Sequence, residues 1–268
     1  MKRLLFIAAA LFTLPATSSL AQSSVLLLKS GSTVYLPSAA NAAGLNGAQF
    51  RTRLFITNNN QGPIGLTVVA ATSGGFLQTT LSRVNQAYVL ENVLEDLFHY
   101  AGGAALSFTL TPDSIPDAVV AMRAEVYTDG PLGEYSTPLP LLTSESIVTG
   151  FSQSIGIRTD SGHRLNVGCS NFGQDAASIQ AELFQGEGSA SLYYFQLMPG
   201  QWMQTAVDPA SLTSSQVPGV FNFGRTDAVS TTTTLPVFCF AVIVSNASND
   251  GTLVPAVPDA GIINPSPY

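Results

Sequence analysis

The chain has 268 residues, and charged residues make up only 10% of it while apolar residues make up 46%. Lys and Arg number 10 against 17 Asp and Glu, which gives a formal net charge of −7. So few cations cannot track a nucleic-acid backbone, and this composition also excludes a charge-rich disordered chain and a coiled coil. A chain of this length holds one large domain or two ordinary ones.

The first 21 residues predict an export signal. Lys2 and Arg3 form a short basic start, Leu4 to Pro15 is apolar, and Ser19-Leu20-Ala21 has the small-x-small pattern of a cleavage site. A membrane anchor is the alternative, but about a dozen apolar residues are too few to cross ~30 Å of hydrocarbon. We therefore expect an exported protein, located in the periplasm, at the cell surface or outside the cell, with no transmembrane segment after cleavage.

Short runs rich in β-branched and aromatic residues fill the rest of the chain. Gly, Pro, Asn or Asp separate these runs about every 8–12 residues, a spacing typical of an all-β sandwich or barrel. The clearest runs are Arg53 to Thr57, Gly65 to Thr72, Leu106 to Leu110, Ala118 to Tyr127, Ile179 to Phe184, Ser191 to Leu197 and Leu235 to Ser245. One segment, Glu91 to His99, favours a short helix because its apolar residues recur at helical spacing.

Three segments of the first half recur in the same order in the second half. They are Arg53 to Asn60 and Arg164 to Asn171 (offset 111), Gln86 to Tyr88 and Gln201 to Met203 (offset 115), and the strands before Asp129-Gly130 and Asp250-Gly251 (offset 121). Loop insertions between two copies of one module would make the offset grow in this way. We predict an all-β fold of two tandem immunoglobulin-like β-sandwich domains, residues 24–140 and 147–268, with one short helix in the first.

Cys169 and Cys239 are the only cysteines, and each lies in a strand-like run. In an exported chain this pair predicts a disulfide in the second module, since a metal site would need more ligands. Closing a loop of about 70 residues stabilises a fold by about 4 kcal/mol in the chain-entropy model. In the predicted repeat Asn58 takes the place of Cys169, so the bridge would reinforce only one copy.

A set of short sequence motifs is spread over most of the chain after the predicted export signal. They are Tyr35 to Ala40, Gly44, Gly47, Phe50 to Leu54, Asn58-Asn59, Leu94 to Phe98, Gly103 to Leu106, Arg123 to Tyr127, Gly133 to Tyr135, and Asn249-Asp250 with Leu253 to Ala256. This set resembles a family of uncharacterised bacterial exported proteins built of paired immunoglobulin-like β-sandwich modules. The resemblance implies secretion and paired modules, and it brings no activity, cofactor or catalytic residue with it.

Side chains suited to catalysis are few. The two histidines are His99, at the end of the predicted helix, and His163, in a turn, and no Gly-x-Ser-x-Gly motif supplies a nucleophile. Glu91 and Glu95 cluster near the helix start, where the helix dipole favours acids. We therefore predict no catalytic residue. The alternative is a secreted, glycosidase-like hydrolase whose carboxylate pair forms only in the fold.

Two groups of residues are candidates for ligand contact. Tyr194 and Trp202 are aromatic residues that could stack on a glycan. Asn246, Asn249 and Asp250 offer the hard oxygen ligands that calcium prefers, although any tight turn needs the same residue types. No cofactor other than calcium is indicated. The leading hypothesis is an exported, non-catalytic β-sandwich protein for adhesion, extracellular structure or ligand binding, with an unidentified glycan or protein partner.

Overall fold

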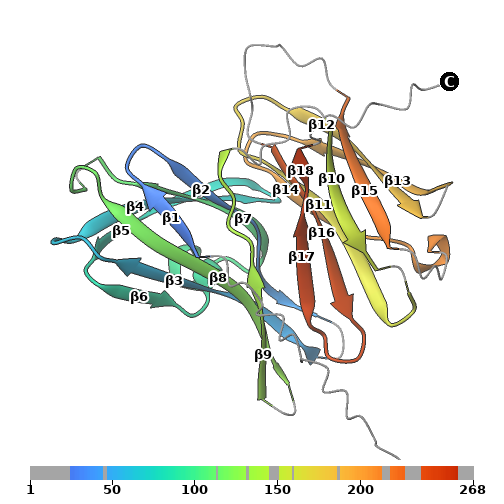
Figure 1. Ribbon diagram of the computed structural model, residues 1–268, viewed down its shortest axis with the longest axis horizontal. Helices are drawn as coiled ribbons and strands as arrows, with labels where there is room; N and C mark the ends of the chain where they lie inside the picture. Colours follow the sequence, from blue (N-terminus) through green and yellow to red (C-terminus); the bar gives the residue numbers. More distant parts are fainter. Residues whose placement is uncertain are drawn as a thin grey trace, which may run out of the picture.

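The structure is a computed structural model that describes residues 25–44, 47–112, 114–130, 133–144, 151–158, 160–185, 188–212, 218–226 and 237–258. The predicted export signal lies outside these ranges. Within them the chain is nearly all antiparallel strand and holds a single α-helix (Figure 1). The all-β prediction is therefore confirmed. None of the helices in the described ranges is long and apolar enough to span a bilayer.

The first half of the chain forms one sheet that folds over on itself. Its elements are β1 (Leu26–Lys29), β2 (Thr33–Ala43), β3 (Gln49–Asn58), β4 (Ile64–Thr72), β5 (Gly75–Val84), β6 (Ala87–Leu90), α1 (Val93–Phe98), β7 (Gly102–Leu110), β8 (Val119–Gly130) and β9 (Gly133–Leu139). Strand β2 pairs β7 over most of its length and β3 at its end, so it joins the layer β2–β7–β4–β5 to the layer β6–β3–β8–β9. Buried apolar side chains from both layers form a first core.

The second half forms two separate sheets. Its elements are β10 (Phe151–Ile157), β11 (His163–Asn171), β12 (Ala177–Gln185), β13 (Gly188–Leu197), β14 (Trp202–Ala206), η3 (Pro209–Ser211), β15 (Gly219–Arg225), β16 (Val237–Ser245), β17 (Gly251–Pro255) and β18 (Val257–Pro258). The sheet β13–β12–β15–β10–β18 faces the sheet β14–β11–β16–β17 across a second core.

Strand pairing follows the same order in both halves. The layer β2–β7–β4–β5 corresponds to β10–β15–β12–β13, and β6–β3–β8–β9 corresponds to β14–β11–β16–β17. Ile56 pairs with Met122 in the first half as Cys169 pairs with Cys239 in the second. The side chains of Asn58 and Asn171 make matching hydrogen bonds, so the position that corresponds to Cys169 is Ile56, and the prediction that Asn58 takes its place was wrong by two residues.

The structure also changes the position of two other features that were predicted from the sequence, the helix and the third recurring segment. The predicted helix 91–99 is Val93–Phe98, because the side chain of Asn92 caps its start and His99, at φ 49°, ends it. The third recurring segment falls at corresponding hairpins, β8–β9 and β16–β17, but Asp129-Gly130 ends the first strand of its hairpin whereas Asp250-Gly251 leads into the second.

The run Val237 to Val244 forms β16 and does not alternate between apolar and polar residues. Cys239 and Ile243 belong to the second core, whereas Phe240 belongs to the first. A strand that is covered on both faces reads as a continuous apolar run. The sheet β14–β11–β16–β17 therefore lies between the two cores.

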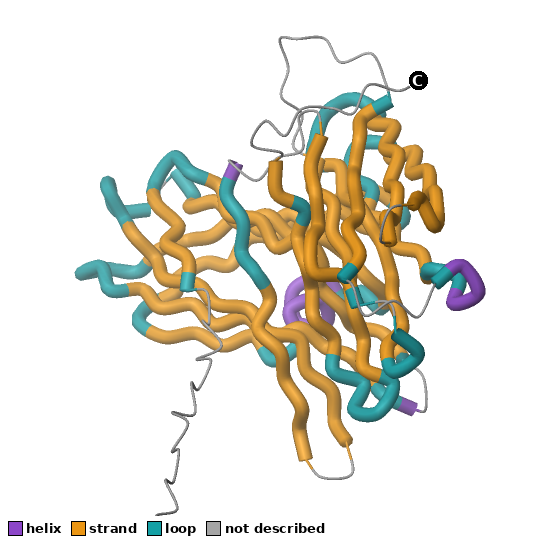
Figure 2. The backbone as a smooth tube through the Cα atoms, turned by 45° about the vertical axis from the view of Figure 1, so that its right-hand side comes forward, coloured by secondary structure: helices purple, strands orange, loops and turns teal. Residues whose placement is uncertain are grey.

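Contacts across this boundary are extensive. The ring of Tyr35 on β2 lies 4.5 Å from that of Phe238 on β16, measured between centroids. The backbone N–H of Thr72 donates to the carbonyl of Gly200 over 3.0 Å. Figure 2 shows the two halves packed side by side, with the β8–β9 hairpin extending past the rest of the first half. The halves share a packed apolar interface.

Candidate functional site

A cleft of about 510 Å³ lies between the two halves, at the end of β2. Its size is within the range of small-molecule sites, ~300–1,000 Å³. One wall comes from β2, β3 and the strands beside them, and the other from the outer face of β14–β11–β16–β17. The cleft is therefore built by both halves together.

The wall from the first half is made mainly of small side chains. Ala40, Ala42 and Gly44 line it at and beyond the end of β2, with Phe50 and Thr52 from β3. A Cβ at Gly44 would collide with the ring of Phe50, so the absence of a side chain there lets the ring lie against the backbone. These short residues leave the space that forms the cleft.

The wall from the second half carries the polar groups. Arg164 and Asn166 alternate with the inward-facing residues of β11, so both point to the outer face of the sheet. Gln204 and Ala206 line the cleft from the neighbouring strand β14, where Ala206 pairs with Asn166. Val242 on β16 adds an apolar surface beside them.

Trp202, a predicted ligand contact, lies at the end of the cleft. Its ring stacks on Phe240 at 6.4 Å between centroids and covers Gly103, where a Cβ would collide with the indole. The indole Nε1 is buried and has no hydrogen-bond partner among the residues that the structure describes. Such a donor costs free energy until an acceptor reaches it.

Arg164 is the one ionisable side chain among the described residues that line the cleft. Its guanidinium donates to Oδ1 of Asn249 over 2.8 Å and to Oδ1 of Asn246 over 3.3 Å. Both acceptors are neutral amides, and burial lowers the pKa of Arg164 below its ordinary value. In contrast, Arg51 and Arg53 each form ion pairs with carboxylates. Arg164 is a half-buried cation without a carboxylate partner in the described ranges.

The candidate calcium ligands lie in the turn that holds Arg164. Since the side-chain oxygens of Asn246 and Asn249 accept hydrogen bonds from a guanidinium, they already face a positive charge. In the described residues no group of three or more His, Cys, Asp and Glu side chains is placed to hold a metal ion. Calcium binding by this turn, with Asp250, stays a prediction that these contacts do not support.

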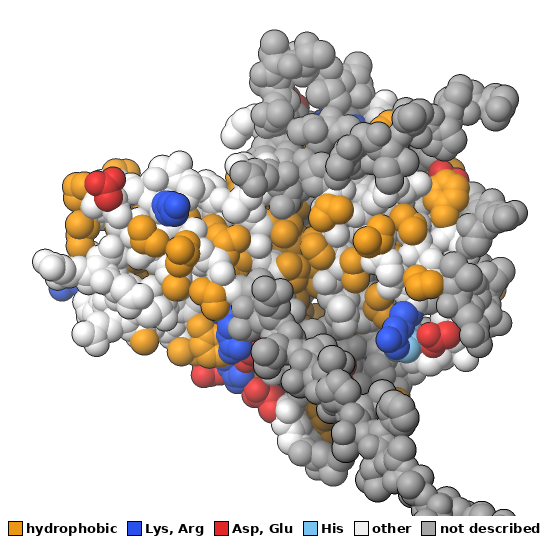
Figure 3. Space-filling model, viewed as in Figure 1, with side chains coloured by type: hydrophobic (Ala, Val, Ile, Leu, Met, Phe, Trp, Pro, Cys, Tyr) orange, Lys and Arg blue, Asp and Glu red, His pale blue; other side chains and the backbone are white. Residues whose placement is uncertain are grey.

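Tyr194 and Trp202 lie on different sheets of the second half, and Tyr194 does not line the cleft. Tyr194 lies on β13, pairs with Gln180 and is 66% exposed. Its neighbour Tyr193 points inward against Phe221, 6.3 Å away. Figure 3 shows several separate apolar side chains on the second half. The structure does not bring the two predicted aromatic contacts together.

The acidic side chains gather elsewhere, around Arg53 on the outer face of β3, β8 and β9. Its guanidinium contacts Glu91 at 2.5 Å, Glu125 at 2.8 Å and Glu134 at 2.9 Å, and it lies 4.2 Å from the centroid of the Tyr127 ring. Glu91 was predicted to lie in the helix. It instead precedes the cap residue Asn92 and pairs with Arg53. Figure 3 shows charged side chains gathered at the lower edge of the first half.

Both histidines lie outside the cleft lining. Nδ1 of His163 lies 2.7 Å from Oδ1 of Asp160 in an exposed turn, and this hydrogen bond lowers the pKa of Asp160. His99 ends α1, and its Nδ1 lies 3.6 Å from Glu95 on the surface. The fold does not place either pair beside the cleft.

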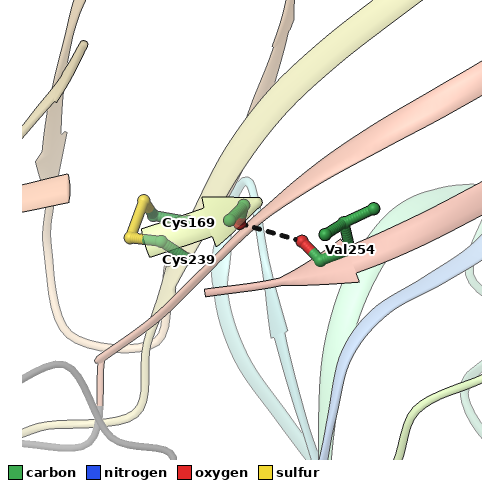
Figure 4. Close-up of a disulfide and its surroundings, with 4 residues drawn as sticks. Cys169, Cys239 and Val254 are labelled. Atoms are coloured by element: carbon green, nitrogen blue, oxygen red, sulfur yellow. Dashed lines mark hydrogen bonds between the residues drawn. A yellow bond between two sulfur atoms is a disulfide. The ribbon is translucent and has the colours of Figure 1, made fainter. Parts of the chain in front are cut away.

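The predicted disulfide is confirmed. Cys169 and Cys239 occupy directly paired positions on β11 and β16, with their Cα atoms 4.1 Å apart (Figure 4). Nearby, the hydroxyl of Ser154 on β10 donates to the carbonyl of Val254 on β17 over 3.0 Å, which links the two sheets of the second half. The bridge itself fixes two neighbouring strands within one sheet.

Comparison with known proteins gives little further information. No family model matches the chain, and no curated protein matches it. Among solved structures, it is similar to an α-L-rhamnosidase from Streptomyces avermitilis in complex with L-rhamnose, with 9% identity and a TM-score of 0.23. The match covers 86% of this chain but 26% of the rhamnosidase. A likeness of this degree carries no argument about function.

Proposed function

We propose that the protein is an exported, non-catalytic binding protein made of two copies of one immunoglobulin-like sandwich module, and that it binds its ligand in the cleft between them. The observation that carries the proposal is the lining of this cleft. Apolar side chains make up most of it, and Asn166, Gln204 and Arg164 supply hydrogen-bond donors. A preformed, largely apolar cavity with a few polar groups is the usual form of a small-molecule site.

Other features support the remaining parts of this proposal. A disulfide suits an oxidising compartment outside the cytoplasm, as an exported protein would meet. The shared order of strand pairing is what duplication of one module would produce. The packed interface between the halves would hold the cleft in its shape before the ligand arrives, and preorganisation of this kind reduces the entropic cost of binding.

A thermal-shift screen tests the binding function. The chain without its first 21 residues is screened against amphipathic small molecules, oligosaccharides and peptides. We expect a class of ligand to raise the melting temperature, and Ala42→Phe, which fills the cleft, to abolish this shift. Ala87→Phe is the matched control, because Ala87 is exposed on β6 and does not line the cleft.

The screen also addresses the alternative hydrolase. The same panel of glycans, with esters and peptides, is assayed for turnover. Hydrolysis that is lost in Glu95→Gln or His163→Ala would overturn the non-catalytic function. The absence of any thermal shift that Ala42→Phe removes would overturn ligand binding in the cleft.

A further inference from the structure

Arg164 indicates the charge of the ligand. A guanidinium has five N–H donors, and the hydrogen bonds from Arg164 to Asn246 and Asn249 use two of them. Neutral amides position the group but leave its charge uncompensated. Because burying an unpaired charge is costly, an anion that reached Arg164 would recover this cost and form charge-assisted hydrogen bonds.

The order of residues along β11 indicates the length of the ligand. Arg164 lies at one end of the cleft, Asn166 follows on the same face, and Ser170, the partner of Trp202, lies six residues from Arg164. A strand rises about 3.3 Å per residue, so the cleft runs for roughly 13–20 Å from Arg164 to the indole. Gln204 lies between these ends, opposite Gly168. The cleft therefore fits an elongated molecule with one end at Arg164.

The chemistry of the walls indicates the body of the ligand. Beyond Arg164 the lining is neutral, with Val242 and Leu253 of the second half on one side and Phe50 with the small residues of β2 on the other. Apolar surface removed from water here contributes about 25 cal/mol per Å². A second charge in this part of the cleft would lose its hydration without gaining a partner.

We propose that the cleft binds an elongated amphipathic anion, with its carboxylate on Arg164 and its apolar body along β11 and β14 towards Trp202. This inference rests on the proposed binding function and adds the class of ligand. The amide of Asn166 hydrogen-bonds polar atoms near the head of the ligand, and that of Gln204 reaches polar atoms further along it. The small side chains of Ala40 and Ala42 allow the apolar body to lie against the backbone of β2.

Fluorescence of Trp202 tests this inference directly, because the chain has one tryptophan. Three probes of equal chain length are titrated below their micellar concentrations: dodecanoate, dodecanol and dodecyltrimethylammonium. We expect dodecanoate to give a saturable change in emission and to bind roughly tenfold or more tightly than dodecanol, with the cation weakest. Acetate, which has the head without the body, should not bind.

Variants of the protein test separately how the anionic head and the apolar body of the ligand contribute to binding. Arg164→Gln should weaken dodecanoate binding roughly tenfold or more while leaving dodecanol binding nearly unchanged. Arg158→Gln is the matched control, since it removes an exposed arginine of the same half outside the cleft. Ala42→Phe should weaken both probes. If Arg164→Gln does not fold, added salt on the unmodified protein should weaken dodecanoate and not dodecanol.

The outcomes distinguish this inference from the proposed function. Equal binding of dodecanoate and dodecanol, or unchanged dodecanoate binding in a folded Arg164→Gln protein, would overturn the anion and leave ligand binding in place. Binding of a neutral oligosaccharide that Ala42→Phe abolishes, with no response to dodecanoate, would do the same. Failure of every class of probe to bind in the cleft would overturn both.

Discussion

Asn58 and Asn171 make the same set of hydrogen bonds at matching places in the two halves of the fold. Each side-chain amide donates to the carbonyls four and 26 residues ahead, and each side-chain oxygen accepts from the backbone N–H two residues ahead. Both side chains are at most 2% exposed. Each ties the end of a central strand to the loop that follows and to the end of the next β-hairpin.

Replacement of either asparagine should destabilise the protein by a similar amount. Asn58→Ala or Asn171→Ala leaves two carbonyls and one N–H without a partner in a buried place, so we expect each to lower the free energy of unfolding by about 2–4 kcal/mol. Urea unfolding followed by circular dichroism measures the loss. Asn222→Ala is the control, because within the described ranges Oδ1 of Asn222 has no hydrogen-bond partner. A loss below 1 kcal/mol at Asn58 or Asn171 would contradict this account.

These asparagines also explain why the sequence comparison of the two halves was two residues out of register. The segment Arg53 to Asn60 was matched to Arg164 to Asn171 on its arginine and its terminal asparagines. The matching hydrogen bonds instead align Asn58 with Asn171. Side chains on one face repeat every two residues, so a two-residue shift keeps each apolar residue on its own face, and periodicity alone cannot detect it.

The disulfide should be important for the second half of the fold. Cys169→Ala with Cys239→Ala removes a link across 70 residues, and the chain-entropy model gives a loss of about 4 kcal/mol. Thermal unfolding with and without reductant measures it. The double variant should unfold at the same lower temperature in both conditions, whereas the unmodified protein should shift only with reductant. Equal melting temperatures of the unmodified protein in both conditions, with reduction verified by thiol labelling, would contradict the prediction.

The cleft was harder to predict than the fold. Alternation along β11 puts Leu165, Val167 and Cys169 on one face, and all three lie in the second core. The same alternation puts Arg164 and Asn166 on the opposite face, but the sequence does not show what covers that face. The non-alternating run of β16 was the available signal, since a strand that is apolar on both faces must be covered on both. The partner that covers it could not be derived.

Acid should weaken the ion-pair network around Arg53. Hydrogen bonds from its guanidinium lower the pKa of Glu134. The carboxylate of Glu134 therefore binds a proton more readily in the unfolded chain than in the folded one. The stabilisation from the ion pair is present above the ordinary pKa of about 4.3 and is lost as pH falls through the lower pKa of the folded state. Glu134 is 38% exposed, so solvent screening keeps the effect below about 1 kcal/mol.

Unfolding measured between pH 6 and pH 3 tests this. Glu134→Gln should lower stability at pH 6 and flatten its dependence on pH, because the variant has no proton to bind. Titration of the Glu134 carboxyl by ¹³C NMR is the direct measurement. A titration midpoint that does not rise in Arg53→Gln would contradict the assignment of the pKa shift to Arg53.

Gly200 lies at the contact between the two halves. Comparison with Gly156 separates two effects of adding a side chain at Gly200: the backbone strain of a positive φ and the collision with Phe76. Gly200 and Gly156 have nearly the same positive φ, 75° and 77°. A Cβ at Gly200 would lie 2.6 Å from the ring of Phe76, whereas none of the surrounding atoms lies within 4 Å of a Cβ at Gly156. Gly156→Ala should therefore cost only the backbone term, about 1–2 kcal/mol. Gly200→Ala should cost about 1–3 kcal/mol more, because the ring of Phe76 must move. Urea unfolding measures both losses.

Since Phe76 and Gly200 belong to different halves, Gly200→Ala should also increase amide exchange at Thr72, whose N–H donates to Gly200. Equal losses in the two variants, or unchanged exchange at Thr72, would show that this contact does not hold the halves together.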